Sequence, residues 1–275
     1  MIKNVWAVYF SPAGSTERVA RQIAQAAAQT LGTGEVLICD WTLPGQREKD
    51  WNFTEEDLVI LASPTYAGRV PNKIMPFVRD HIRGGGAAGV AVVTFGNRSY
   101  DDALMELNLL MKDNGFRMSG AGAFVCRHVM SGMLAAGRPS EADLAEAADF
   151  GHRIGNGVLC SKDSFDDFKI PGNSPVGPYY RPLEEDGKPA SFLKAKPKLK
   201  PEICNQCGKC AAVCPMGSID PDHAEQVTGV CIKCQACVLK CPMHARYFDD
   251  PSLLSHIRML ENSYSGRDRA NEWYL

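Results

Sequence analysis

Eight of the eleven cysteines in this 275-residue sequence fall in two short runs toward its C-terminal end. In each run three cysteines follow one another at intervals of three residues, and a fourth cysteine, followed by proline, stands four positions later. The eight positions are Cys204, Cys207, Cys210, Cys214, Cys231, Cys234, Cys237 and Cys241. Deprotonated thiols are soft ligands, and three of them on one tight loop can surround one face of a metal cluster. The fourth ligand must come from elsewhere, so the spacing predicts a thiolate-bound metal centre.

This spacing resembles the C-x2-C-x2-C-x3-C-P pattern of bacterial dicluster ferredoxins, which the sequence contains twice. The resemblance implies two [4Fe-4S] clusters with crossed ligation, in which the last cysteine of each run binds the other cluster. One implied set is Cys204, Cys207, Cys210 and Cys241, and the other is Cys231, Cys234, Cys237 and Cys214. Small residues in the loops leave room for backbone N–H groups to approach the sulfur atoms, and such hydrogen bonds help to set the reduction potential.

Zinc and disulfide bonds are the alternative explanations for these cysteines. Structural zinc sites usually take cysteine pairs separated by a longer loop, rather than three cysteines in close succession followed by Cys-Pro. Disulfides need an oxidising compartment, and nothing in the sequence points to one. Both alternatives are therefore weaker than the iron–sulfur hypothesis.

Composition narrows the class of protein. The net charge of −2 favours neither nucleic acid nor an anionic membrane as a partner. The opening residues 1–10 are too short an apolar stretch for a signal peptide, and no apolar run has the length of a membrane span. Because exposed clusters are easily oxidised, we expect a cytoplasmic protein in a reducing, anaerobic setting.

The N-terminal half supplies the elements that must position a partner for the clusters. Short apolar runs alternate with segments of helical periodicity, which predicts an α/β fold with a doubly wound, five-stranded parallel sheet. Ligands of such sheets bind beyond the carboxyl ends of the strands. The expected strands are 5–10, 36–39, 58–62, 89–95 and 121–126.

The first turn of this half, residues 11–16, joins a strand to a helix and carries hydroxyl groups and glycine. Backbone N–H groups and the helix dipole converge there, which is the physical basis of a phosphate site. The turn resembles the flavodoxin phosphate loop at Ser11, Gly14 and Thr16, whereas Ala13 stands where that pattern has a hydroxyl. The alternative is an ordinary helix start, with Ser15 or Thr16 as the capping residue.

Two further loops extend the resemblance to flavodoxins, which covers residues 1–156 and implies that FMN is bound. The loop at 63–68 resembles the one on one side of the isoalloxazine ring, and the loop at 94–97 with Tyr100 resembles the one on the other side. The implied FMN-binding residues are Ser11, Ala13, Gly14, Ser15, Thr16, Ser63, Pro64, Thr65, Tyr66, Ala67, Gly68, Thr94, Phe95, Gly96, Asn97 and Tyr100.

His128 follows the fifth expected strand, so it is a candidate proton donor at the flavin edge. The alternative, which we favour, is a solvated or structural loop histidine.

The rest of the chain divides into three parts. Residues 157–199 are rich in proline and lack periodicity, so we expect a connector, part of which packs across the domain interface. Residues 200–249 form the expected ferredoxin domain, and residues 250–275 form a helix over 252–261 and a tail. Lysines alternate just before the cysteines and serve either as a soluble spacer, which we prefer, or as a docking patch for an acidic partner.

The two halves are together similar to flavodoxin–ferredoxin fusions of anaerobes. Clusters pass single electrons and flavin takes one or two, so we expect electron transfer between two [4Fe-4S] clusters and FMN, serving a redox partner protein or a small acceptor. One alternative is a flavin-dependent reductase that acts directly on a small organic substrate. Another is a non-redox interaction module that binds zinc.

Overall fold

The computed structural model of the chain describes residues 1–160 and 168–275, so positions 161–167 of the predicted connector lie outside the described residues. Five parallel strands form the central sheet in the order β2-β1-β4-β6-β7. They are β1 (Asn4–Tyr9), β2 (Leu37–Asp40), β4 (Asp57–Pro64), β6 (Ala88–Phe95) and β7 (Arg117–Val125). Each coincides with an apolar run of the sequence, and β6 is buried along its whole length. The predicted parallel sheet is confirmed.

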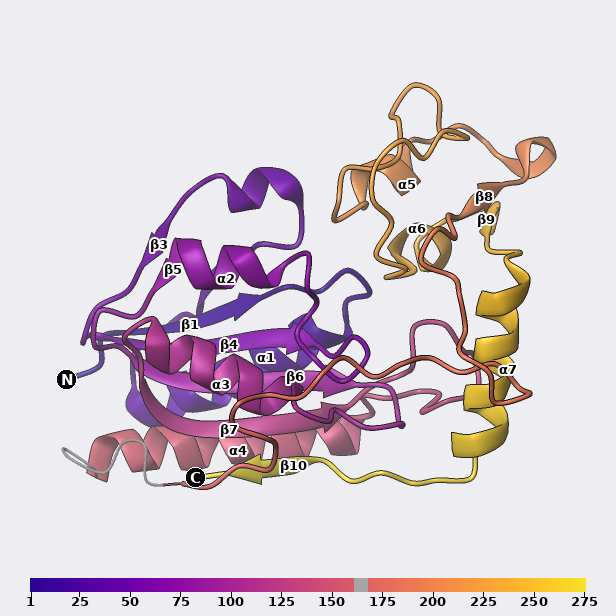
Figure 1. Cartoon of the computed structure of the whole chain (residues 1–275). Helices are drawn as coiled ribbons and strands as arrows, with labels where there is room; N and C mark the ends of the chain where they lie inside the picture. The colour runs from indigo at the N-terminus through magenta and orange to yellow at the C-terminus, as the bar shows by residue number, and fades with distance from the viewer. Residues whose placement is uncertain (161–167) are drawn as a thin grey trace.

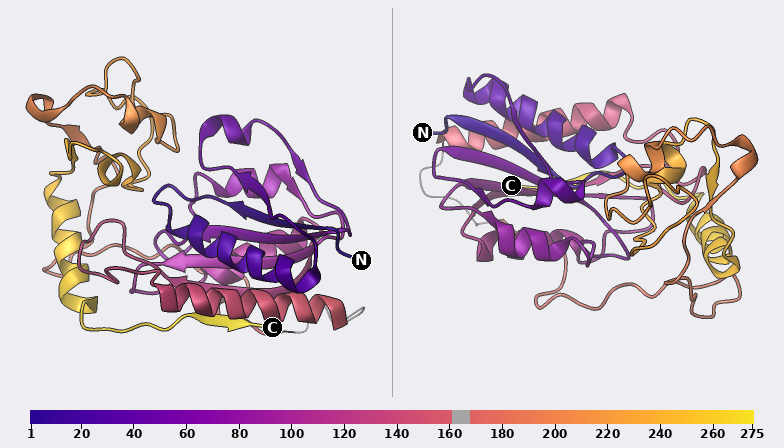
Figure 2. Two further views of the ribbon diagram at one scale, coloured as in Figure 1. Left: turned by 180° about the vertical axis from the view of Figure 1, so that it is seen from behind. Right: turned by 90° about the horizontal axis from the view of Figure 1, so that it is seen from above.

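Helices cover both faces of this sheet, as Figure 2 shows in the view from above. Helices α1 (Ser15–Leu31) and α4 (Glu141–Cys160) pack on one face through Ile23 and Phe150. Helices α2 (Met75–His81) and α3 (Ala103–Asp113) pack on the other face. Two hydrophobic cores result, and together they fix the strand ends that carry the candidate loops. Helix α4 ends at Cys160, beyond the predicted domain end at 156.

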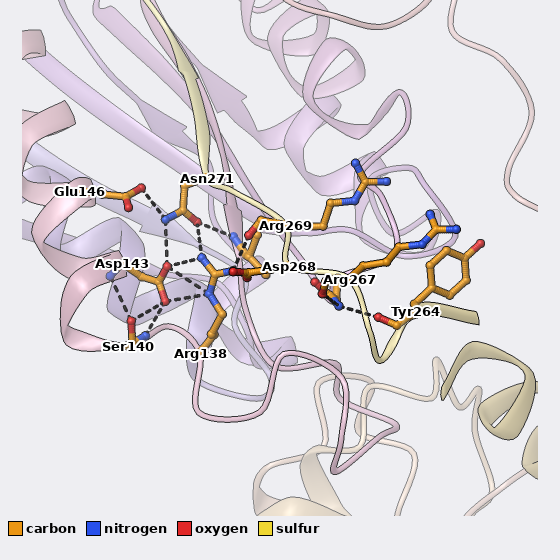
Figure 3. A network of polar contacts seen from close by, with 11 residues as sticks. Arg138, Ser140, Asp143, Glu146, Tyr264, Arg267, Asp268, Arg269 and Asn271 are labelled. Atoms are coloured by element: carbon orange, nitrogen blue, oxygen red, sulfur yellow. Dashed lines mark hydrogen bonds and ion pairs between the residues drawn. The ribbon is translucent and has the colours of Figure 1, made fainter. Parts of the chain in front are cut away.

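A sixth strand, β10 (Glu272–Tyr274), lies antiparallel to β7 at the edge of the sheet, and the sequence did not predict it. The tail that carries β10 returns along the sheet from the C-terminal helix (Figure 1). Asn271 anchors this tail, because its Nδ2 donates to Asp143 (3.0 Å) and its Oδ1 accepts from the backbone of Val125 (2.9 Å). Arg138 pairs with the same Asp143 and donates to the backbone of Arg269 (Figure 3).

The remaining elements are short, apart from α7. Beside the sheet lie η1 (Pro44–Arg47), β3 (Trp51–Asn52) and β5 (Ile82–Arg83). The cysteine-containing part consists of β8 (Lys198–Leu199), η2 (Pro201–Ile203), α5 (Lys209–Ala212), α6 (Ala236–Leu239) and β9 (Arg246–Tyr247). Helix α7 (Pro251–Tyr264) confirms the helix expected over 252–261. Among the described residues, none of the helices combines the length and the apolar character needed to cross a lipid bilayer.

The two cysteine runs fold as one repeated unit. Helices α5 and α6 stand at equivalent places in the two runs. Left-handed backbone conformations also occur at equivalent positions of the two runs. They are found at Gln206 and Lys233 (both φ 56°) and at Gly217 and His244 (φ 58° and 51°). Non-glycine residues rarely adopt this conformation, so its recurrence shows that both loops follow the same tight path. Figure 1 places this unit beyond the carboxyl ends of the parallel strands.

The described part of the connector packs across the molecule, as expected. Asp102 accepts hydrogen bonds from the backbone N–H groups of Asn173 (2.9 Å) and Gly177 (2.7 Å). The backbone N–H of Tyr180 then donates to the carbonyl of Ala67 at 2.8 Å, within a candidate flavin loop. Farther on, Lys198 pairs with Asp249 at 2.8 Å. The connector thus holds the sheet loops and the cysteine unit in one arrangement.

Candidate functional site

The turn at 11–16 has the features of an anion site at the start of α1. Gly14, with φ 92°, is the capping residue that precedes the helix, so Ser15 and Thr16 do not play the alternative capping role. The Ser11 hydroxyl accepts from the backbone N–H of Glu17 at 2.9 Å and shapes the turn. The Thr16 hydroxyl bonds that of Thr94 at 2.7 Å and ties this turn to a second candidate loop.

Unpaired donors remain at this turn. Among the described residues, none accepts a hydrogen bond from the backbone N–H groups of Ala13, Ser15 or Thr16. Orphan N–H groups at the start of a helix favour an anion such as a phosphate, because the helix dipole adds to their partial positive charge. The local chemistry therefore fits a phosphate group.

The loop at 63–68 ends β4, next to the point where the strand order reverses. The backbone groups of Tyr66 and Arg69 bond each other across a tight turn, with Ala67 (φ 50°) and Gly68 (φ 76°) at its tip. The Thr65 hydroxyl is buried and has no hydrogen-bond partner among the described residues. A buried hydroxyl without a hydrogen-bond partner destabilises the folded state. A polar group of a ligand could provide that partner for Thr65. Ser63 and Pro64 form the last residues of β4 and lead into this turn.

The loop at 94–97 keeps only part of its predicted role. Thr94 and Phe95 end β6, but the side-chain amide of Asn97 donates to the carbonyls of Tyr264 (2.9 Å) and Arg267 (2.8 Å). The Asn97 side chain therefore secures the end of α7. Gly96 is packed against the ring of His128.

Tyr100, predicted to lie in the second flanking loop, is packed inside the domain. Its ring is 8 % exposed and packs edge-on against Phe95 at 5.2 Å. Its hydroxyl donates to Glu272 at 2.6 Å and lies 3.2 Å from the hydroxyl of Tyr274. Both partners belong to strand β10, which the sequence did not predict.

His128 behaves as the structural alternative describes. Its Nδ1 accepts from the backbone N–H of Met130 at 3.3 Å. Burial, together with the positive charges of His256 and Arg98, lowers the pKa of His128 to about 4. The imidazole is therefore neutral at pH 7, and its observed contacts order the loop.

Backbone N–H groups point at the cysteine sulfurs in the same pattern in both runs. Gln206 N donates to Cys204 Sγ, and Lys233 N donates to Cys231 Sγ, each at 3.4 Å. Near the ends of the runs, Ser218 N donates to Cys214 Sγ and Ala245 N to Cys241 Sγ, each at 3.3 Å. Hydrogen bonds of this kind stabilise thiolates and tune the metal that they bind.

One cavity brings together the four cysteines of one crossed set. Cys214 of the first run lines it with Cys231, Cys234 and Cys237 of the second run. Burial raises the pKa of both Cys234 and Cys237 to about 12. Such thiols lose their protons when a metal binds, so metal binding is coupled to proton release. No three His, Cys, Asp or Glu side chains in the described ranges are grouped to hold a single metal ion.

The other set is more exposed. Cys207 lies at the surface, and Cys204, Cys210 and Cys241 are partly exposed. Although burial opposes it, N–H groups of Ala245, Met243 and Arg246 lower the pKa of Cys241 below that of an ordinary thiol.

The cysteine unit packs against the part of the chain that forms the sheet. Met216 and Ile232 pack against the hydrophobic core beneath α2 and α3. Arg47 donates to the carbonyl of Pro215, the residue after Cys214, at 2.5 Å. Burial raises the pKa of Tyr66 well above its usual value, and the nearby thiols of Cys234 and Cys231 raise it further. The charges of the enclosed cysteine set therefore act on a tyrosine of the loop at 63–68.

Sequence reasoning missed two residues of this region. Arg47 gives no signal in the sequence, because its contact with Pro215 depends on how the two halves meet. Arg246 was detectable, since it occupies the position five residues after the last cysteine of its run, where the other run has Ile219.

Comparison with known proteins agrees with the cysteine spacing. Residues 196–242 match the family model of the 4Fe-4S dicluster domain. No curated protein matches the sequence.

Several solved structures resemble the N-terminal part. A flavodoxin from the domain Archaea is 17 % identical with a TM-score of 0.40, over 57 % of this chain and 99 % of that one. A Streptococcus pneumoniae flavodoxin is 18 % identical with a TM-score of 0.39, over 55 % and 97 %. The flavodiiron protein of Giardia intestinalis is 19 % identical with a TM-score of 0.39, over 57 % of this chain and 36 % of that one.

The order of the five parallel strands is that of the flavodoxin-like doubly wound fold. The dicluster match supports [4Fe-4S] clusters as cofactors, and such clusters transfer electrons. The chain joins a flavodoxin-like α/β domain to a 4Fe-4S dicluster ferredoxin domain, a combination that supports a role in electron transfer.

Proposed function

We propose that this protein transfers electrons between two [4Fe-4S] clusters and FMN within one chain. The observation that carries the proposal is the contact between the two parts of the chain: Met216 and Ile232 of the cysteine unit pack against the core of the sheet, and Arg47 donates to the carbonyl of Pro215. When bound, FMN exchanges electrons singly or in pairs, whereas the clusters exchange them one at a time.

The crossed sets of cysteines are the proposed cluster ligands. The cavity lined by Cys214, Cys231, Cys234 and Cys237 supports one set. The matching N–H donors to Cys204 and Cys241 support the other set by analogy, because the two runs share one backbone path.

FMN is the proposed ligand of the sheet loops. The free N–H groups of Ala13, Ser15 and Thr16 would hold its phosphate. The turn at 63–68 would flank the ring on the side of the cysteine unit, with the Thr65 hydroxyl as a polar contact. The residues at 94–96 would border the ring on the other side. Asn97, Tyr100 and His128 have structural roles in this proposal.

Exposure suggests where a partner exchanges electrons with the protein. Cys207 is exposed, whereas Cys234 and Cys237 are each 8 % exposed. A redox partner protein or small acceptor would therefore exchange electrons at the exposed cluster, and the enclosed cluster would connect it to FMN.

Anaerobic purification followed by cofactor analysis tests the proposal. We expect about eight iron atoms and eight sulfides per chain, from two clusters of four, and one FMN. Replacing Cys234 with alanine should remove about four irons and leave FMN bound, whereas Thr65→Val should weaken FMN binding and leave the iron unchanged. Bound FAD, a flavin-free protein or only four irons in the natural chain would contradict the proposal.

A further inference from the structure

Arg246 is a buried cation placed against one of the two cysteine sets. Its side chain is 2 % exposed, and its Nη2 donates to Cys210 Sγ at 3.4 Å and to the carbonyl of Ala224. Its Nε and Nη1 are buried without a hydrogen-bond partner among the described residues. In the part of the chain that the structure describes, no carboxylate pairs with this guanidinium.

Such a residue needs a negative partner. A buried guanidinium stays charged, and an unpaired buried charge is strongly unfavourable. The group of opposite charge within reach is a cysteine thiolate, since the Arg246 side chain bonds Cys210. Cys210 belongs to the set completed by Cys204, Cys207 and Cys241.

The equivalent position in the other run is apolar. Ile219, five residues after Cys214, is 5 % exposed and pairs with Val227 through a single backbone bridge. Arg246, five residues after Cys241, lies in β9 and pairs with Leu199. The second run also has a buried cation, Lys233, but its Nζ donates to the carbonyls of Leu193 and Cys231. The two halves therefore share one backbone plan, and among the described residues only Arg246 donates a side-chain hydrogen bond from a buried cation to a cysteine sulfur.

A fixed positive charge beside a cluster stabilises the reduced form, because reduction adds a negative charge. The charge of Arg246 also reaches Cys237 of the other set, but among the described residues no hydrogen bond joins these two side chains. The Arg246 charge therefore stabilises the reduced form more strongly at the cysteine set that contains Cys210, which Arg246 contacts directly.

We propose that Arg246 makes the two clusters unequal by raising the reduction potential of the one held by Cys204, Cys207, Cys210 and Cys241. This inference rests on the proposed cluster ligands and adds an order to the electrons. The first electron resides on the exposed cluster, and a second is needed before the enclosed cluster beside Tyr66 is reduced.

Redox titration of the natural protein, followed by EPR and by the shifted NMR signals of the cysteine β-protons, tests this order. The NMR signals identify which cysteines surround the reduced cluster. We expect two separate one-electron steps, with the step at higher potential assigned to Cys204, Cys207, Cys210 and Cys241. A higher potential at the other cluster, or equal potentials, would overturn the inference without any variant being made.

Variants then test whether the charge is the cause. In R246Q the potential of the exposed cluster should fall so that the one-electron distribution between the clusters shifts at least tenfold, which is 59 mV for a one-electron couple. R246K keeps the charge and should restore part of the difference. The control is K209Q, which removes an exposed charge next to Cys210 and should have little effect because water and salt screen it.

The outcomes separate this inference from the proposed function. If R246Q holds both clusters and its two potentials match those of the natural protein, Arg246 does not set the order, and the electron-transfer proposal stands. If the natural protein itself lacks two clusters, the proposed ligands are wrong.

Discussion

At the residue scale, the candidate FMN site depends on hydroxyl groups that join loops far apart in the sequence. The bond between Thr16 and Thr94 is the clearest, because it links the first turn to the end of β6 at 2.7 Å in a buried position. FMN would contact the first turn through its phosphate and the end of β6 through its ring, so the two loops must keep a fixed separation. The bond between Thr16 and Thr94 therefore contributes both to the stability of the fold and to the affinity for FMN.

Replacing Thr16 with valine should lower the free energy of unfolding by about 1–2 kcal/mol, because the Thr94 hydroxyl loses its partner in a buried site. FMN binding should weaken in parallel. Urea denaturation and flavin titration measure the two effects, and the double variant with Thr94→Val should cost less than the sum of the single ones. Thr33→Val is the control, since the buried Thr33 hydroxyl has no partner among the described residues. Strict additivity would show that the two hydroxyls are not coupled.

His128 should make stability depend on pH in the acid range. Its folded-state pKa of about 4 lies below the usual value of 6.5, so between these values the unfolded chain binds the proton more readily. Stability is complete above about pH 6.5 and falls as the pH decreases toward 4. We expect His128→Gln to flatten the dependence of the unfolding free energy across this window, as measured by urea denaturation at several pH values. If the unfolding free energy of His128→Gln depends on pH as strongly as that of the natural protein, burial does not lower the pKa of His128 as described.

At the element scale, the C-terminal tail is a structural part of the flavodoxin-like domain. Asp143 receives hydrogen bonds from Arg138, Ser140 and Asn271, and although burial opposes it, these bonds hold the pKa of Asp143 far below its usual value. Its stabilising effect is therefore present at neutral pH and is lost in strong acid, as the pH falls through the folded-state pKa. Figure 3 shows how this network connects the tail to the start of α4.

Asp143→Asn should lower the free energy of unfolding by about 3 kcal/mol, because it leaves the largely buried Arg138 without its carboxylate. Hydrogen exchange should also speed up in β7, which pairs with β10. Glu146→Gln is the matched control, since Glu146 meets the same Asn271 at an exposed position. Equal losses in the two variants would contradict the importance of the buried ion pair.

The sequence predicts elements whose signal is local and misses those that depend on long-range contacts. Five apolar runs predict the five parallel strands, and the spacing of eight cysteines predicts the dicluster domain. Strand β10 has only three residues in a polar tail, too few for periodicity to reveal. The bond from the Tyr100 hydroxyl to Glu272 of that strand therefore has no signal in the sequence. The contact of Arg246 with Cys210 likewise appears only when the two runs fold together.

At the scale of the whole molecule, the arrangement of the two domains decides whether electrons can pass between them. Arg47 links the domains, since its guanidinium donates to the carbonyls of Trp41, Thr42 and Pro215. Met216 and Ile232 add apolar contacts from the cysteine unit. The interface thus holds the cysteine unit against the sheet domain.

Arg47→Ala should loosen this interface and cost about 1–2 kcal/mol, because buried carbonyls lose their donor. Iron and flavin contents should stay unchanged, while electron exchange between the domains becomes slower. Stopped-flow absorbance measures the rate, and Arg79→Ala, an exposed arginine paired only with its neighbour Asp80 among the described side chains, is the control. A normal rate in Arg47→Ala would show that this contact does not position the domains.

The most direct test of electron transfer within one chain is flash reduction of the oxygen-free protein at several protein concentrations. Absorbance changes of the clusters and of the flavin follow the electron after the flash. The account predicts a first-order exchange between the two chromophores whose rate constant does not change with protein concentration. A rate that rises in proportion to protein concentration, or clusters and flavin that never exchange electrons, would contradict it.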